Sequence, residues 1–143
     1  MFILASADFT NGLGLGVDIG NAADVGFSDL LPCLARDSRI KVINLHMEGL
    51  AHGREFMEAA SKITSSKPVV VYKSGRSTEG AKAAASHSAS LAGEDKVIHA
   101  AFKKAGVIRA ENLEEMNDLN KAFLTYPQLN GKRFAVITLS GGG

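Results

Sequence analysis

His87 is the residue of this chain whose neighbours best suit it for chemistry. It lies in the run AAASHSASLAG at residues 83–93, which is built almost wholly of alanine, serine and glycine. Small side chains let the backbone approach a ligand closely, and serine hydroxyls and amide N–H groups are good partners for phosphate oxygens. A neutral imidazole is basic enough at pH 7 to attack phosphorus. The run therefore makes His87 a candidate for nucleophilic attack on phosphorus.

A carboxylate on the second ring nitrogen would fix the tautomer of that imidazole and stabilise its charged phosphorylated form. Glu48 is the candidate, because it directly follows an apolar run that reads as a strand. Ser86 and Ser88 beside the histidine, Gly75 and Asn21 are candidate contacts for the phosphate.

These residues also have ordinary structural interpretations. An alanine-rich segment is more often a packed helix than a phosphate cradle, and Glu48 beside a glycine can be a solvated strand end. His46 is expected inside a strand, His52 in a polar turn and His99 on a helix. Together with Cys33 alone they do not make a zinc site, so no metal is expected. The chain has no Walker A loop and no Gly-x-Ser-x-Gly elbow.

Apolar runs predict the strands that would position this chemistry. The three strongest lie at residues 42–45, 69–72 and 134–139, and they are nearly continuous rather than alternating. Such runs are typical of parallel strands that are covered on both faces. Residues 13–19, where glycines intervene, form a weaker candidate, and residues 107–109 form a short one.

Segments with helical periodicity lie between these runs. They fall at residues 25–35, where Pro32 weakens the pattern, at 56–63 and at 97–105. A further helix is expected to open at Asn112.

The ends of two of these helices carry their own signals. Gly106 should end the third helix, with Lys103 and Lys104 well placed for the helix dipole. Asn112 followed by Glu115 has the spacing of a capping box.

Strands that alternate with helices predict an α/β domain with a parallel sheet and helices on both faces. In such sheets ligands bind beyond the carboxyl ends of the strands. The segments that follow the predicted strands, at 20–24, 47–49 and 73–93, should therefore gather at one edge. This places Asn21, Glu48 and His87 within one candidate site.

Size and charge exclude other classes of function. The 143 residues suit one core, and a net charge of +1 provides no basic surface for nucleic acid or anionic lipid. No run approaches the ~20 apolar residues of a membrane span, and the first residues do not form a signal peptide. The single cysteine, Cys33, allows no internal disulfide and fits a reducing compartment. A cytoplasmic protein is the default expectation.

Beyond these patterns, much of the sequence resembles a known family. The matching residues are GNAAD at 20–24, KPVVVYKSGRS at 67–77, GAKAAASHSASLAG at 80–93 and AGVIR at 105–109. They look like the middle CoA-ligase domain of NDP-forming acyl-CoA synthetases, the ADP-forming acetyl-CoA synthetase type within the succinyl-CoA synthetase superfamily. That family's pattern around the histidine is Ala-Ala-Ser-His-Thr-Gly-x-Leu-Ala-Gly.

The resemblance implies a flavodoxin-like three-layer domain over residues 1–129, truncated at its N-terminus. Residues 130–143 would then be a linker and the first strand of a following, truncated domain. The chain would be a piece of a longer enzyme, whose CoA-binding Rossmann domain and ATP-grasp domain it lacks. Those two domains are its expected partners, and an open sheet edge could in addition pair two copies into a homo-oligomer.

The resemblance also implies a reaction. Acyl-CoA, ADP and phosphate interconvert with a free small carboxylic acid, CoA and ATP, by way of an acyl phosphate. The histidine matching His87 carries the phosphoryl group, the glutamate matching Glu48 steadies it, and the loop then moves to the ATP-grasp domain. CoA, ATP or ADP and Mg²⁺ would belong to the full enzyme. This chain is expected to bind no cofactor and to be inactive alone.

One departure from the family pattern concerns the loop. Ser88 and Ala89 stand where the family has threonine and glycine. Serine keeps the hydroxyl, but alanine adopts positive φ less easily than glycine, which affects the geometry of the loop rather than its chemistry.

Two other interpretations are open. The chain could be a non-catalytic, ligand-sensing module of a protein acetyltransferase, although the presence of both His87 and Glu48 favours chemistry. It could also be a stand-alone flavodoxin-like binding module. That interpretation explains the fold but not the Ser86-His87-Ser88 loop.

Overall fold

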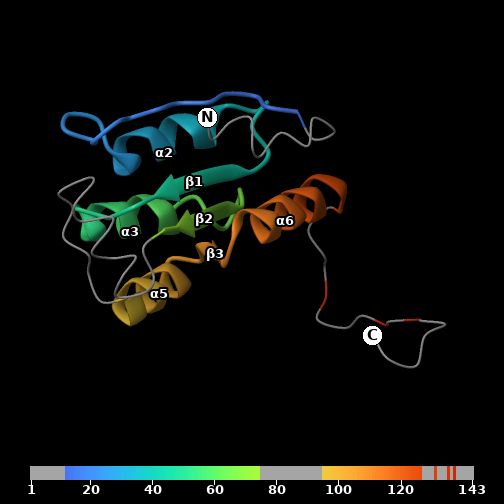
Figure 1. Cartoon of the computed structure of the whole chain (residues 1–143). Helices are drawn as coiled ribbons and strands as arrows, with labels where there is room; N and C mark the ends of the chain where they lie inside the picture. The colour runs from blue at the N-terminus through green and yellow to red at the C-terminus, as the bar shows by residue number, and fades with distance from the viewer. Residues whose placement is uncertain (1–11, 75–94, 127–130, 132–134, 136, 138–143) are drawn as a thin grey trace.

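The computed structural model describes residues 12–74 and 95–126, together with residues 131, 135 and 137. Within these residues three strands alternate with helices (Figure 1). The elements in chain order are α2 (Phe27–Arg36), β1 (Ile43–Met47), α3 (Gly53–Ser61), β2 (Val69–Lys73), α5 (Asp95–Lys104), β3 (Ile108–Ala110) and α6 (Leu113–Thr125). This confirms the predicted α/β class. The strand predicted at 134–139 falls almost wholly outside the described residues.

The described strands form one parallel sheet in the order β1-β2-β3. Val69, Val70 and Val71 of the middle strand β2 are fully buried. A middle strand covered on both faces needs apolar side chains in both directions, which is why its sequence is continuous rather than alternating.

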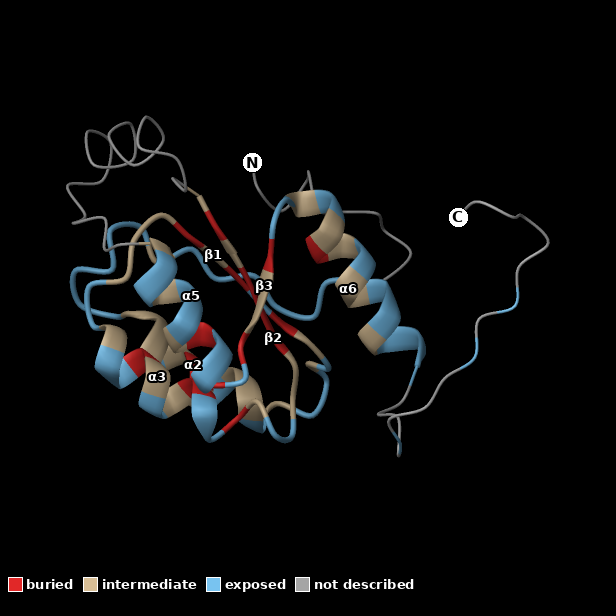
Figure 2. Cartoon of the chain, turned by 90° about the horizontal axis from the view of Figure 1, so that it is seen from below, coloured by how far each residue is buried: buried red, intermediate tan, exposed pale blue. Residues whose placement is uncertain are grey.

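Helices cover the two faces of the sheet, with α2, α3 and α5 on one face and α6 on the other (Figure 2). The larger core lies under the three helices, where Phe56 of α3 contacts Phe27 and Phe102 with ring centroids 6.5 and 5.8 Å apart. The smaller core under α6 contains Val70, Ala110 and Met116. The result is the three-layer arrangement expected from the sequence.

Helix α2 forms despite Pro32, which removes one N–H group from its interior. Leu31 on the same helix is fully buried against the sheet. At the N-terminal end, the Asp29 carboxylate accepts a hydrogen bond from the Gly26 N–H at 2.9 Å. Tertiary packing and the capped end together outweigh the lost backbone bond.

The capping box predicted for α6 is half confirmed. Asn112 Oδ1 accepts a hydrogen bond from the Glu115 N–H at 2.8 Å. The Glu115 carboxylate accepts from the N–H of Glu111 at 2.6 Å, one residue earlier than the reciprocal bond would require. The helix therefore begins where the sequence predicted, with a shifted return bond.

Helix α5 ends before Gly106, as predicted. Gly106 has φ of +71°, and the Val107 N–H bonds back to the Phe102 carbonyl at 2.9 Å. A Cβ at Gly106 would lie 2.8 Å from Oγ1 of Thr64, which itself donates to the Ala105 carbonyl at 2.7 Å. Both the backbone conformation and the close approach of α3's C-terminal turn require glycine here.

The weak strand prediction at residues 13–19 is wrong. The segment forms no strand, and its apolar side chains Leu13, Leu15 and Val17 are 66%, 52% and 50% exposed. Alternating glycines make an extended conformation costly in entropy, and a strand forms only where a neighbour satisfies its backbone groups. Within the described residues, the sheet gives this segment no such neighbour.

No helix of the described residues is both long and apolar enough to cross a membrane.

Candidate active site

Glu48 lies at the carboxyl edge of the sheet, as predicted. It is half-buried and directly follows β1, whose last residue, Met47, pairs with Lys73 at the end of β2. The next residue on that side, Ser74, donates its N–H to the Met47 carbonyl at 3.0 Å. Glu48 therefore follows β1 at the same edge of the sheet where the chain leaves β2 for residues 75–94.

Four predicted site residues lie outside the described residues. They are Gly75, Ser86, His87 and Ser88. Their distances to Glu48 are untested, so the roles assigned to them stay predictions.

Asn21, the sixth predicted site residue, is exposed in a tight turn. The Ala22 N–H donates to the Ile19 carbonyl at 2.9 Å, and the Gly20 N–H donates to the Asp18 carboxylate at 2.9 Å. The segment leading into α2 reaches the end of the molecule where β1 terminates (Figure 1). No hydrogen bond between the described residues joins Asn21 to Glu48, so its role as a phosphate contact also stays a prediction.

A stacked pair of rings lies next to Glu48, on the α6 face of the sheet. His46 of β1 and Tyr72 of β2 stack with centroids 5.4 Å apart and an interplanar angle of 18°. Burial lowers the pKa of His46, and the negative charge of Glu48 partly opposes this shift. The sequence placed His46 in a strand but gave no sign of the stacking.

A charged cluster of Lys73, Asp95 and Arg109 lies at the same edge and was missed by the sequence analysis. Arg109 donates to both Asp95 carboxylate oxygens, from Nη2 at 2.5 Å and Nη1 at 3.2 Å. Lys73 is 2% exposed, and burial is the main cause that lowers its pKa. The nearby Asp95 opposes that shift and Arg109 adds to it.

The register of the sheet brings this cluster together. Arg109 of β3 pairs with Val71 of β2, and Lys73 lies two residues further along β2, so both side chains lie on the α5 face. Asp95 is the first residue of α5. Its carboxylate is therefore at the positive end of the helix dipole as well as beside the guanidinium.

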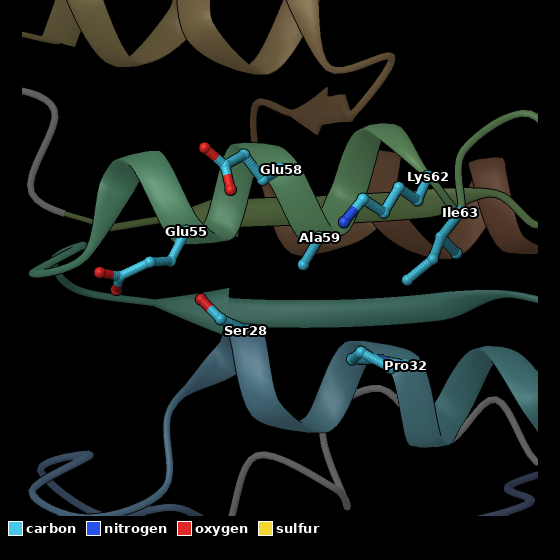
Figure 3. A pocket seen from close by; sticks show the side chains of 7 residues that line it. All are labelled: Ser28, Pro32, Glu55, Glu58, Ala59, Lys62 and Ile63. Carbon is cyan, nitrogen blue, oxygen red and sulfur yellow. The ribbon is translucent and has the colours of Figure 1, made fainter.

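A surface pocket lies elsewhere, between α2 and α3 (Figure 3). Its lining includes Ser28 and Pro32 of α2 and Glu55, Glu58 and Ala59 of α3. Neither Glu48 nor Asn21 lines it. The pocket is therefore not part of the candidate site at the carboxyl edge.

The described residues contain no group of three or more histidine, cysteine, aspartate or glutamate side chains arranged to hold a metal ion. Among the described residues, this edge offers the carboxylates of Glu48 and Asp95 and the buried cations of Lys73 and Arg109.

A parallel three-layer α/β arrangement with charged side chains at the carboxyl edge defines a flavodoxin-like domain. Comparison with known proteins refines this class. Residues 2–123 match the family described as "Succinyl-CoA ligase like flavodoxin domain". The chain therefore belongs to that family.

Two relatives with assigned activities are ADP-forming ligases. The chain is 46% identical over 131 residues to "Acetate--CoA ligase [ADP-forming] I subunit alpha" of Pyrococcus furiosus, an alignment that covers 92% of this chain and 28% of that protein. It is 46% identical over 126 residues to "Acetate--CoA ligase [ADP-forming]" of Methanocaldococcus jannaschii, covering 88% of this chain and 18% of the relative.

A solved structure agrees with these matches. It is the dinucleotide-forming acetyl-coenzyme A synthetase 1 of Ca. Korarchaeum cryptofilum in complex with phosphate and ADP. The TM-score is 0.76 at 39% identity, and the match covers 80% of this chain and 25% of that one. The chain thus corresponds to one region of larger ligases and spans less than a third of the relatives named here.

Proposed function

We propose that this chain is the phosphohistidine-carrying domain of an NDP-forming acyl-CoA synthetase and that His87 carries the phosphoryl group. The proposal is supported by 46% identity to a subunit of an ADP-forming acetate–CoA ligase. The structural observation that carries it is the position of Glu48. Glu48 directly follows Met47, whose carbonyl accepts from the N–H of Ser74, the residue after which the segment that contains His87 begins.

In the proposed step, an imidazole nitrogen of His87 attacks the phosphorus of an acyl phosphate. The P–O bond to the acyl group breaks, the N–P bond forms, and the electron pair leaves with the released carboxylate. A later transfer to ADP breaks the N–P bond and gives ATP. Glu48 accepts the proton on the other ring nitrogen in a hydrogen bond and stabilises the charged ring.

The remaining steps are assigned to other parts of the full enzyme. A CoA-binding domain and an ATP-grasp domain that binds ADP and Mg²⁺ are the proposed partners, with residues 1–129 as the carrier domain and residues 130–143 as the connection onward. On this proposal, the 143 residues accept a phosphoryl group but do not complete turnover.

The decisive experiment uses acetyl phosphate as the phosphoryl donor. The 143-residue chain is incubated with it and digested at alkaline pH, where phosphohistidine survives, and the site is read by mass spectrometry. We expect acid-labile phosphate on His87 and none in the H87N variant, with H52N as the matched control that keeps the label. Label that persists undiminished in H87N, or that favours the exposed His52, contradicts the proposal and favours a ligand-sensing role.

The role of Glu48 has a separate test. Because a hydrogen bond to a charged group contributes about 1.5–3 kcal/mol, E48Q should lower the amount of phosphohistidine at equilibrium by roughly 10- to 100-fold. The matched control is E55Q, which removes the carboxylate paired with Nδ1 of His52 at 3.1 Å on the surface. Equal label in E48Q and E55Q would remove Glu48 from the site.

A further inference from the structure

Two buried cations at the carboxyl edge have hydrogen-bond donors to spare. Lys73 is 2% exposed, and its Nζ donates to the Ser74 carbonyl at 3.2 Å, which occupies one of its three N–H groups. The Arg109 side chain is 3% exposed, and its Nε is buried without a hydrogen-bond partner among the described residues. Buried donors of this kind are rare in proteins unless they await a partner.

The charges of this cluster do not balance. Asp95 supplies one negative charge and accepts from both terminal nitrogens of Arg109. Lys73 and Arg109 supply two positive charges, so the three groups together carry one positive charge in excess when all are ionised. Buried charge is costly unless an opposite charge accompanies it.

A lysine at the opposite edge shows what a satisfied partner set looks like. Lys67 lies just before β2, and its Nζ donates to the carbonyl oxygens of Leu34 and Asp37 at 3.0 and 2.8 Å. Within the described part of the chain, Lys73 at the far end of the same strand has one carbonyl acceptor at 3.2 Å, and it is more deeply buried. The difference falls at the edge of the sheet where ligands of parallel α/β folds bind.

We propose that Lys73 and Arg109 form a binding site for a small oxyanion, either a phosphate or a carboxylate. The spare N–H groups of Lys73 and the Nε–H of Arg109 supply the hydrogen bonds, and the oxyanion balances the excess charge. The N-terminal end of α5, at Asp95, adds the positive end of a ten-residue helix.

This inference rests on the proposed function for the identity of the anion. Inorganic phosphate, the phosphoryl group of an acyl phosphate and the carboxylate of the acid are all reactants of the proposed reaction. Lys73 and Arg109 would hold one of them at the edge where Glu48 lies.

Thermal unfolding with added potassium phosphate tests the site, because a ligand that binds only the folded chain raises the unfolding midpoint. Ionic strength is held constant with potassium chloride. We expect phosphate to raise the midpoint of the wild-type chain, and K73M to bind phosphate about 10- to 100-fold more weakly, as expected for losing a charged hydrogen bond. Without phosphate, K73M should unfold at an equal or higher temperature than wild type, since methionine fills the space without a buried charge.

Matched variants separate this site from general effects. K67M should keep the full phosphate response, although it removes a lysine from the same strand region. R109K keeps the positive charge but loses Nε, so it should weaken phosphate binding. This variant gives a second test of the site if the K73M substitution rearranges the local structure. A series in potassium acetate distinguishes the two classes of anion, and a Lys73-dependent response to either one supports the site.

The proposed anion site is wrong if neither phosphate nor acetate raises the unfolding midpoint above its value in chloride of equal ionic strength. It is also wrong if the midpoint of K73M responds to phosphate as strongly as that of wild type. If His87 takes no label from acetyl phosphate but the unfolding midpoint still depends on phosphate and on Lys73, the proposed function is wrong and the anion site is supported.

Discussion

At the amino ends of the strands, side chains donate to backbone carbonyl oxygens and close the fold, whereas the buried charged side chains at the carboxyl ends have few such partners among the described residues. Lys67 and Thr64 at the amino edge donate to the carbonyl oxygens of Leu34, Asp37 and Ala105, which lie 30 to 41 residues away in sequence. At the carboxyl edge Lys73 and Arg109 lie together with Asp95 and, among the described residues, have donors left over, while Glu48 follows the neighbouring strand β1.

The difference shows how one small sheet separates stability from binding. Connections at the amino edge join each helix to the next strand, and their bonds fix the helices on the sheet. The carboxyl edge carries Lys73, whose buried charge the fold does not need for its own closure, beside an Arg109–Asp95 ion pair that does contribute to stability. Four sets of substitutions test this division, in order of decreasing expected effect.

The largest effect is expected from R109Q, because it leaves the Asp95 carboxylate without its guanidinium and alters the charge beside buried Lys73. The Arg109 side chain is 3% exposed but that of Asp95 is 34% exposed, so breaking this partly buried pair should cost about 2–3 kcal/mol of unfolding free energy. Urea denaturation measures it, with R54Q on the exposed face of α3 as the control, where a change within about 0.5 kcal/mol is expected. A loss below that level would show that the carboxyl-edge ion pair contributes nothing to stability.

Next in size is G106A at the amino edge. Its φ of +71° disfavours alanine, and the new Cβ would meet Oγ1 of Thr64 at 2.8 Å, so about 2 kcal/mol should be lost. Gly12 has φ of +70°, and a Cβ added there would meet no atom within 4 Å, which makes G12A the matched control for backbone strain alone. In urea denaturation, the difference between the stability losses of G106A and G12A measures the cost of the contact with Thr64. Equal losses in the two variants would show that this contact costs nothing.

A third comparison sets the two lysines against each other. K67M removes two bonds to carbonyl oxygens and should cost about 1–2 kcal/mol of unfolding free energy, whereas K73M should be neutral or stabilising in the absence of phosphate. Denaturant titration of both variants in chloride buffer measures the two changes. If the two variants change stability in the same direction, the contrast between the edges is wrong.

The smallest effect concerns acid stability at the amino edge. Hydrogen bonds from the Arg39 side chain and backbone lower the pKa of the Asp37 carboxyl from 3.8 to about 2. Because the folded pKa lies below the unfolded one, this carboxylate contributes stability above about pH 4 and loses it as pH falls towards 2. Between pH 5 and 2 the thermal midpoint should therefore fall less steeply in D37N than in wild type. Parallel plots of midpoint against pH for the two chains would show that the protonation of Asp37 does not affect stability.

Local sequence was sufficient to predict most of the fold. The continuous apolar run of β2 predicted a buried middle strand because neighbours cover both of its faces. Gly106 and Asn112 predicted helix ends because the requirement is local: a positive φ in one case and a side-chain cap in the other. Residues 13–19 failed because strand formation depends on a neighbouring strand, which is not a local property.

The candidate site was harder to predict. Glu48 was found because it follows a strand, and the parallel topology gathers such residues. Lys73 was overlooked because the predicted strand ended one residue before it, and a lysine after an apolar run reads as a solvated end. Only the register that aligns Val71 with Arg109 brings Lys73, Arg109 and Asp95 together. The role of His87 stays a prediction.

The stacked rings of His46 and Tyr72 give this edge of the molecule an optical signal of its own. The chain contains no tryptophan and two tyrosines, so the ultraviolet emission of the protein comes from Tyr72 and Tyr126 alone. Tyr126 is 68% exposed, whereas Tyr72 lies against an imidazole whose charge responds to Glu48. Tyrosine fluorescence of a Y126F chain therefore reports events at the carboxyl ends of the strands without any attached dye.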